Sequence, residues 1–179
     1  MLIIYVTGMC LAFFYTAPPL KLKYFALGDI AIFVSFGPLL CYCSILLINA
    51  DAAPKVWAEV MTSTLPCACI CECILHANNS RDIGEDRKAG LITLATVLGF
   101  DASRLFYIAL ISGAYLTVVV SGVLRARWGM LLVLLSIPLA RTVVGRFCRD
   151  INIMADLPKQ TAKLHMGFGL LLIAGTLLS

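Results

Sequence analysis

Long apolar runs, separated by short charged stretches, set the pattern of this sequence. Residues 30–50 and 105–124 contain no Asp, Glu, Lys or Arg. A helix needs about 20 apolar residues to cross the core of a lipid bilayer, so each run predicts a membrane-spanning helix. Six spans are predicted in all, at residues 1–17, 29–50, 56–78, 104–124, 128–147 and 162–179.

The predicted fold is an all-α, polytopic transmembrane helix bundle that forms a single domain over residues 1–179. Prolines lie within three of the spans, at Pro38, Pro66 and Pro138. Each predicts a kink, because neighbouring helices in a membrane bundle satisfy the backbone groups that a proline frees.

Composition narrows the classes of function. Of the 179 residues, 61% are hydrophobic and 13% are charged, and the mean hydropathy is +0.95. A soluble domain is closer to half apolar, so an ordinary soluble protein is excluded. The net charge of +4 is too small to indicate a polyanionic partner such as a nucleic acid.

The cysteines suggest neither a disulfide framework nor a zinc site. Cys67, Cys69, Cys71 and Cys73 alternate within an apolar run. On a helix, alternate residues point about 200° apart, so these thiols cannot close one tetrahedron. We expect them to pack as small hydrophobic residues.

Basic residues predict which connections share a side of the membrane. If the spans alternate in direction, the connections after the first, third and fifth spans lie on one face. That face carries ten Lys and Arg residues: Lys21, Lys23, Arg81, Arg87, Lys88, Arg104, Arg146, Arg149, Lys159 and Lys163. The opposite face carries Lys55, Arg125 and Arg127. The excess predicts that the first face is cytosolic, or faces the equivalent side of an organelle, and that the charged loops there form one polar site.

An acidic stripe follows the third span. Asn78, Asp82 and Asp86 recur every four residues, which places them on one side of a continuing helix. Two carboxylates and an amide are typical ligands for Mg²⁺, which also takes oxygens from a substrate phosphate. The alternative is a solvated helix end, with the carboxylates balanced by Arg81 and neighbouring basic residues.

The apolar segment after this stripe, residues 89–98, is too short to cross a membrane. It ends at Gly99, and Asp101 can cap a new helix. We expect this segment to form a half-helix or lid over a cavity.

The connection after the first span carries a second polar patch. Pro18 and Pro19 stiffen it, which fixes Tyr15, Lys21 and Lys23 near the membrane interface. The lysines either contact a diphosphate or meet lipid headgroups. Asp29 either caps the second span or joins the polar site.

A third group of polar residues lies within the third span. Glu72, His76 and Asn79 share one helical face at offsets of four and seven residues. Ionisable groups at this depth face the interior of a bundle. Glu72 and His76 either orient a substrate or make a structural hydrogen bond.

The motif over residues 78–99, Asn-Asn-Ser-Arg-Asp-Ile-Gly-Glu-Asp-Arg-Lys-Ala-Gly-Leu-Ile-Thr-Leu-Ala-Thr-Val-Leu-Gly, resembles the second aspartate motif of the UbiA superfamily of intramembrane prenyltransferases. Residues 15–29 resemble the loop of that family that bears Tyr and Lys. The resemblance implies a nine-helix bundle of which this chain matches helices four to nine. The three preceding helices and the first aspartate motif, Asn-Asp-x-x-Asp, are not in the sequence.

The resemblance also implies a reaction: Mg²⁺-dependent transfer of a prenyl group from an isoprenyl diphosphate to an aromatic, naphthoquinol- or quinone-type acceptor, in menaquinone (vitamin K2) or ubiquinone biosynthesis. Asp82 and Asp86 are the implied catalytic residues, and with Asn78 they hold the metal. The implied substrate-binding residues are Asn78, Asn79, Arg81, Lys21, Lys23 and Tyr15.

The implied location is a multi-pass protein of the endoplasmic reticulum, Golgi or mitochondrial membrane, with the motif loops on the cytosolic or matrix side. The missing first motif leaves a non-catalytic protein that binds a prenyl lipid or a protein partner as the alternative. A channel or transporter would need ionisable residues along a path, and only Glu72 and His76 qualify.

Overall fold

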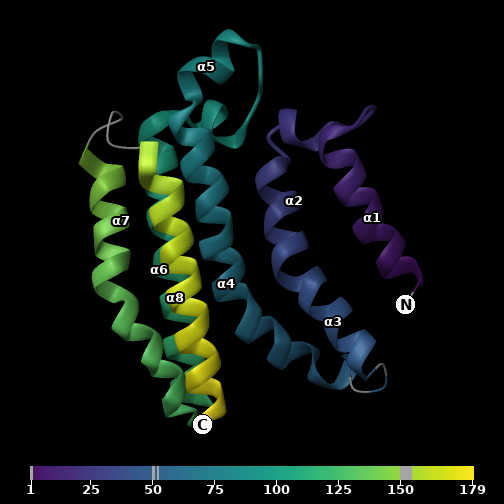
Figure 1. Ribbon diagram of the computed structural model, residues 1–179, viewed down its shortest axis with the longest axis vertical. Helices are drawn as coiled ribbons and strands as arrows, with labels where there is room; N and C mark the ends of the chain where they lie inside the picture. Colours follow the sequence, from purple (N-terminus) through teal and green to yellow (C-terminus); the bar gives the residue numbers. More distant parts are fainter. Residues whose placement is uncertain (1, 50, 52, 150–154) are drawn as a thin grey trace.

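The computed structural model describes residues 2–49, 51, 53–149 and 155–179. Within these ranges the chain forms helices joined by short connections, and no strand is formed. The main helices run along the long axis of the molecule (Figure 1). The predicted all-α fold class is confirmed.

The first part of the chain forms two rods. Helix α1 (Leu2–Thr16) is followed by the short 3-10 helix η1 (Leu22–Tyr24). Helix α2 (Gly28–Val34), the π-helical turn η2 (Ser35–Leu39) and helix α3 (Leu40–Ile48) then form one continuous rod. Pro38 lies in the π-helical turn, where the wider backbone accommodates a residue without an N–H group.

The second part contains the longer helices. These are α4 (Ala53–Arg81), α5 (Ile83–Lys88), α6 (Leu94–Leu124), η3 (Trp128–Ser136), α7 (Ile137–Arg149) and α8 (Leu157–Leu177). Pro66 lies inside α4, and Pro138 lies in the first turn of α7, where the 3-10 helix η3 changes to α-helix.

Four of the described helical stretches are long and apolar enough to cross a membrane: Gly28–Ile48, Lys55–Arg81, Leu94–Leu124 and Trp128–Arg149. They correspond to the second to fifth predicted spans. Helix α1 matches the first predicted span but is shorter, and α8 begins five residues before the last one, at Leu157. The count of six spans stays a prediction.

Helix α4 lies at the centre of the bundle. It packs against α6 and α8 on one side and against α2 and η2 on the other. The core between α6, α7 and α8 contains the buried rings of Tyr107, Phe147 and Phe168, and the Tyr107 hydroxyl lies 2.7 Å from that of Thr161. Large apolar side chains cover the outer faces of the helices, as expected where lipid is the solvent.

The alternating helices bring the predicted polar connections to one end of the bundle, which we call the loop end. It contains residues 17–27, residues 82–93, the last turn of α7 and the first turn of α8 (Figure 1). There the backbone N–H of Ala26 donates to the carbonyl of Ile92 at 2.7 Å, and Phe25 and Ile92 form a parallel bridge. The connection after α1 and the connection after α5 therefore touch.

The packing of η3 on α8 gives a test of the fold. Gly129 and Gly175 face each other so closely that a methyl group on either would overlap the carbonyl of the other. We expect Gly129→Ala to lower the free energy of unfolding by about 1–3 kcal/mol through overpacking, measured by thermal unfolding in detergent. Gly169→Ala on α8, the helix that carries Gly175, is the control, because a methyl there meets nothing within 4 Å. Equal stability of both variants would contradict this packing.

Candidate functional site

The acidic stripe is organised by one arginine. The guanidinium of Arg81 donates to both carboxylate oxygens of Asp82, at 2.7 and 2.8 Å, and to the amide oxygen of Asn78 at 2.9 Å. The Asn78 amide nitrogen also lies 3.5 Å from Asp82. This pairing of Arg81 with Asp82 is what the solvated helix end predicts, so the hydrogen bonds alone do not identify a metal site.

The backbone keeps the predicted stripe nearly continuous. Helix α4 ends at Arg81 and α5 begins at Ile83, yet the N–H of Asp82 donates to Asn78 at 3.2 Å and the N–H of Asp86 donates to Asp82 at 2.8 Å. These are helical i to i−4 bonds, so Asn78, Asp82 and Asp86 follow one another along one side. Asp82 and Asp86 are half-buried at the loop end.

The donor set suits Mg²⁺. Asp82, Asp86 and Asn78 offer only oxygen ligands, and Mg²⁺ binds through one or two carboxylates together with water and substrate phosphates. A carboxylate has about four lone-pair sites. Asp82 can therefore accept both hydrogen bonds from the Arg81 guanidinium and still offer oxygen lone pairs to a metal ion. The three residues that we expected to hold the metal are therefore adjacent and chemically suitable.

Within the segment predicted as a half-helix, residues 94–98 are helical and residues 89–93 are not, and the role as a lid over a cavity stays a prediction. Thr93 caps the half-helix, since the Thr93 hydroxyl accepts from the N–H of Thr96 at 3.2 Å and the Thr96 hydroxyl accepts from the N–H of Thr93 at 2.9 Å. Gly99 breaks the helix with φ 75° and ψ 173°. Arg87 of α5 donates to the Thr96 carbonyl at 3.1 Å, which ties the half-helix to the stripe.

The capping role expected of Asp101 was wrong. Asp101 lies within α6, its side chain is 95% exposed, and it pairs with Arg104 at 3.6 Å. Gly99 is the non-helical residue before the second part of α6, so Asp101 lies inside its first turn, whereas Thr93 caps the half-helix that precedes Gly99.

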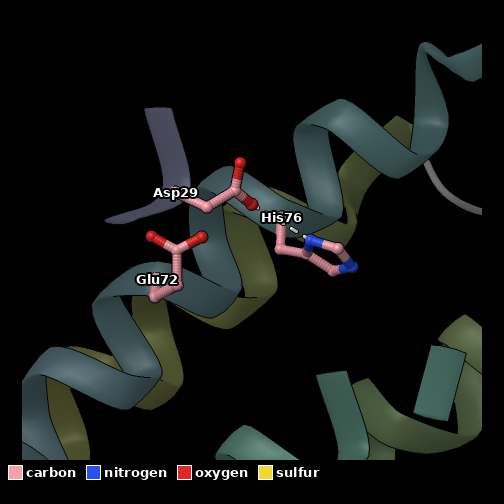
Figure 2. A group of neighbouring side chains, drawn as sticks. All are labelled: Asp29, Glu72 and His76. Carbon is pink, nitrogen blue, oxygen red and sulfur yellow. Dashed lines mark hydrogen bonds and ion pairs between the residues drawn. The ribbon is translucent and has the colours of Figure 1, made fainter. Parts of the chain in front are cut away.

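A second polar group is buried within the bundle (Figure 2). Asp29 from the first turn of α2 lies beside Glu72 and His76 of α4, and each of the three is at most 3% exposed. The Nδ1 atom of His76 lies 3.2 Å from an Asp29 carboxylate oxygen, and Nε2 lies 3.2 Å from the carbonyl oxygen of Ser103 on α6. Asp29 thus joins a polar site; it makes no side-chain cap on α2.

An apolar cavity of about 520 Å³ lies between α1 and the rod formed by α2, η2 and α3. Its lining comes from α1, α2, η2 and α3, and includes Leu11, Tyr15, Ile32, Phe36 and Leu39. Tyr15 of α1 is the tyrosine of the predicted substrate-binding set, and it lines this cavity.

The remaining predicted substrate residues are less tightly placed. Lys21 is exposed at the loop end and has a left-handed backbone, with φ 44°. Lys23 lies in η1, and its side chain is outside the described part of the structure. Asn79 is buried, facing the bundle interior as its spacing from Glu72 and His76 predicts.

Comparison with known proteins places the chain in a family. The family model described as "UbiA prenyltransferase family" matches residues 1–154. The chain belongs to the UbiA prenyltransferase family. This agrees with the resemblance of residues 78–99 to its second aspartate motif.

Among UbiA-family proteins, the chain is similar to three animal relatives. It is 36% identical over 171 residues to the UbiA prenyltransferase domain-containing protein 1 homolog of Drosophila melanogaster, covering 96% of this chain and 46% of that protein. It is 35% identical over 178 residues to UbiA prenyltransferase domain-containing protein 1 of Danio rerio, covering 99% and 50%. The corresponding values for the Homo sapiens protein are 34% over 177 residues, covering 99% and 50%. The chain therefore spans about half the length of these relatives.

Two features of the site were not predicted from the sequence. The first is the contact of His76 with the Ser103 carbonyl, which joins α4 to α6. The second is the set of hydrogen bonds by which the Arg81 guanidinium holds Asn78 and Asp82 together. Helical spacing could have suggested the second, since Asn78 and Arg81 are three residues apart. No sequence signal points to the first, because it depends on how two helices pack.

The backbone break at the half-helix can be tested. The φ and ψ of Gly99 fall in a region that only glycine populates readily, so we expect Gly99→Ala to cost about 1–3 kcal/mol. The expected result is faster amide hydrogen exchange in residues 94–99. Gly84→Ala in α5 is the control, because Gly84 is helical and a methyl there meets nothing within 4 Å. Unchanged exchange in Gly99→Ala would show that the break is not needed.

Proposed function

We propose that this chain is the carboxy-terminal part of a membrane prenyltransferase. Its reaction is Mg²⁺-dependent transfer of a prenyl group from an isoprenyl diphosphate to an aromatic, naphthoquinol- or quinone-type acceptor, in menaquinone or ubiquinone biosynthesis. The observation that carries the proposal is the stripe of Asn78, Asp82 and Asp86 at the loop end of a UbiA-family bundle.

The two parts of an isoprenyl diphosphate, the polar diphosphate and the apolar tail, match two different regions of the bundle. A diphosphate is polar and needs cations, and the loop end offers Arg81, Arg87 and the oxygen ligands of the stripe. An isoprenoid tail is apolar and needs a site away from water, which the cavity beside Tyr15 offers. We propose that the diphosphate binds at the stripe and that the tail extends between α1 and the α2–α3 rod.

Each residue of the stripe has a role in this proposal. When bound, Mg²⁺ neutralises the charge that develops on the diphosphate as the allylic carbon–oxygen bond breaks. Asp82, Asp86 and Asn78 hold the ion. Arg81 positions Asp82, and its guanidinium adds positive charge beside the leaving group. The half-helix after Thr93 limits the access of water to the reacting atoms.

The location of the protein is part of the proposal. Four apolar helices and the family support an integral membrane protein. We propose the endoplasmic reticulum, Golgi or mitochondrial membrane, with the loop end on the cytosolic or matrix side, because the basic residues gather at that end.

The acidic stripe gives the direct test. We expect Asp82→Ala and Asp86→Ala, each made in the protein encoded by the complete transcript, to lower Mg²⁺-dependent prenyl transfer at least about 100-fold, because each removes charge that holds the metal. The assay measures transfer from geranylgeranyl diphosphate to a naphthoquinol in membranes, with insertion checked by protease protection.

Asp101→Ala is the matched control. It removes a carboxylate at the same end of the bundle, but one that is 95% exposed and paired with Arg104. Its activity is expected to remain within about twofold of the unaltered protein, as for other surface substitutions. Full activity of both stripe variants would remove Asp82 and Asp86 from the mechanism.

A non-catalytic role remains the second candidate. The observation that favours it is the Arg81 pair, which already neutralises Asp82. A protein of this kind would bind prenyl lipid without transferring it. Prenyl-lipid binding by the complete protein, together with no Mg²⁺-dependent transfer, would favour this alternative.

A further inference from the structure

Three carboxylates of the described bundle pair with an arginine, and two buried carboxylates do not. Asp82 pairs with Arg81, Asp101 with Arg104, and Glu59 with Arg127. Asp29 and Glu72 have no such arginine or lysine among the described residues, although both are buried. Among the described residues, the basic side chain beside them is His76, whose Nδ1 lies 3.2 Å from Asp29.

The orientation of His76 fixes which of its nitrogens faces the carboxylates. Nε2 lies 3.2 Å from the Ser103 carbonyl oxygen, which can only accept, so Nε2 carries a proton and donates. In a neutral ring Nδ1 then presents a lone pair toward Asp29, 3.2 Å away. Histidines that bind metals typically donate their other ring N–H to a backbone carbonyl in this way.

Glu72 adds a third acceptor to the same space. Neither of its carboxylate oxygens has a hydrogen-bond partner in the described part of the chain, although the residue is only 2% exposed. Figure 2 shows its carboxylate directed toward that of Asp29. A buried carboxylate without a donor is strongly unfavourable, so its charge is removed either by a proton on the carboxyl group or by a bound cation.

The three side chains converge on one small volume, and the widest separation must shorten for all three to bind one ion. One ligand atom from each of Asp29, Glu72 and His76 lies within 4.8 Å of the other two. Two donors on a tetrahedral ion with bonds of about 2.0–2.2 Å lie about 3.4 Å apart, close to the separation of His76 Nδ1 and Asp29. Two carboxylates and a neutral imidazole around a divalent ion also have no net charge, which suits the interior of a membrane bundle.

We propose that Asp29, Glu72 and His76 form a binding site for one divalent transition-metal ion, for which Zn²⁺ is the best match. An imidazole ligand favours Zn²⁺ over Mg²⁺, which prefers oxygen alone. The ion joins α2 to α4, and through the His76 contact with Ser103 it also fixes α6. It leaves a coordination position open, as three protein ligands do in catalytic zinc sites.

This site is separate from the stripe proposed to hold Mg²⁺. His76 and Asp82 are six residues apart on a helix, which places them about 9 Å apart along its axis. The two sites share no ligand. Binding at the buried site is therefore measured without any prenyl substrate, and its outcome is independent of the transfer reaction.

The test is metal binding by the complete protein purified in detergent. After removal of metal with a chelator, equilibrium dialysis against Zn²⁺ is expected to show one tightly bound ion per chain. We expect Glu72→Gln and His76→Gln each to weaken that binding at least about tenfold, since even partners outside the ligand shell are worth that much.

Two variants serve as controls. His165→Gln removes the second of the two histidines in the chain, and Asp82→Ala removes a carboxylate of the stripe. Both are expected to keep the ion. Absence of a bound ion in the unaltered protein would overturn the proposal, as would retention of the ion in Glu72→Gln and His76→Gln.

Co²⁺ substitution in the unaltered protein provides a second measurement that does not depend on how the variants fold. The proposed ligands are nitrogen and oxygen, so the spectrum should lack a thiolate-to-metal charge-transfer band. The neighbouring cysteines, among them Cys69 and Cys73 on α4, are the competing ligands. A strong thiolate band would assign the ion to the cysteines and overturn the proposal.

Discussion

The need to satisfy every polar group inside an apolar solvent determines where polar side chains meet in this protein. Backbone groups are satisfied within helices, so ionisable side chains reach one another only where helices pack or where the chain leaves the membrane. Helix α4 provides both situations, because its middle is buried between α2 and α6 and its end reaches the loop end. Glu72 and His76 belong to the first situation, and Asn78 and Asp82 to the second.

Features that depend on spacing along one helix were predictable from the sequence. The runs without charge predicted the helices, and the four-residue repeat of Asn78, Asp82 and Asp86 predicted a stripe that the backbone hydrogen bonds preserve. The offsets of Glu72, His76 and Asn79 predicted that all three face the interior, where they are buried. Each inference needs only the pitch of a helix, which is the same in every protein.

Features that depend on contacts between segments far apart in the sequence were not predictable. Asp29 is 47 residues from His76, and nothing in its surroundings distinguishes a helix cap from a partner for another helix. The half-helix was predicted, but its cap, the reciprocal pair of Thr93 and Thr96, was not. Asp101, expected to cap the helix after Gly99, instead pairs with Arg104. Local rules suggest several candidates for such a cap, and packing selects among them.

The two acidic regions of α4 differ chiefly in how their charge is balanced. At the loop end the arginine next to Asp82 in the sequence suffices, because Arg81 and Asp82 are both about one-third exposed and water screens the remaining charge. The same solution is not open to Glu72, since a long basic side chain would itself have to be desolvated among Asp29, His76 and the surrounding helices. A compact charge, a proton or a metal ion, is the remaining way to stabilise that site. With Nε2 directed to the Ser103 carbonyl, His76 keeps Nδ1 facing Asp29, where this nitrogen either donates to the carboxylate or binds the metal ion that we propose.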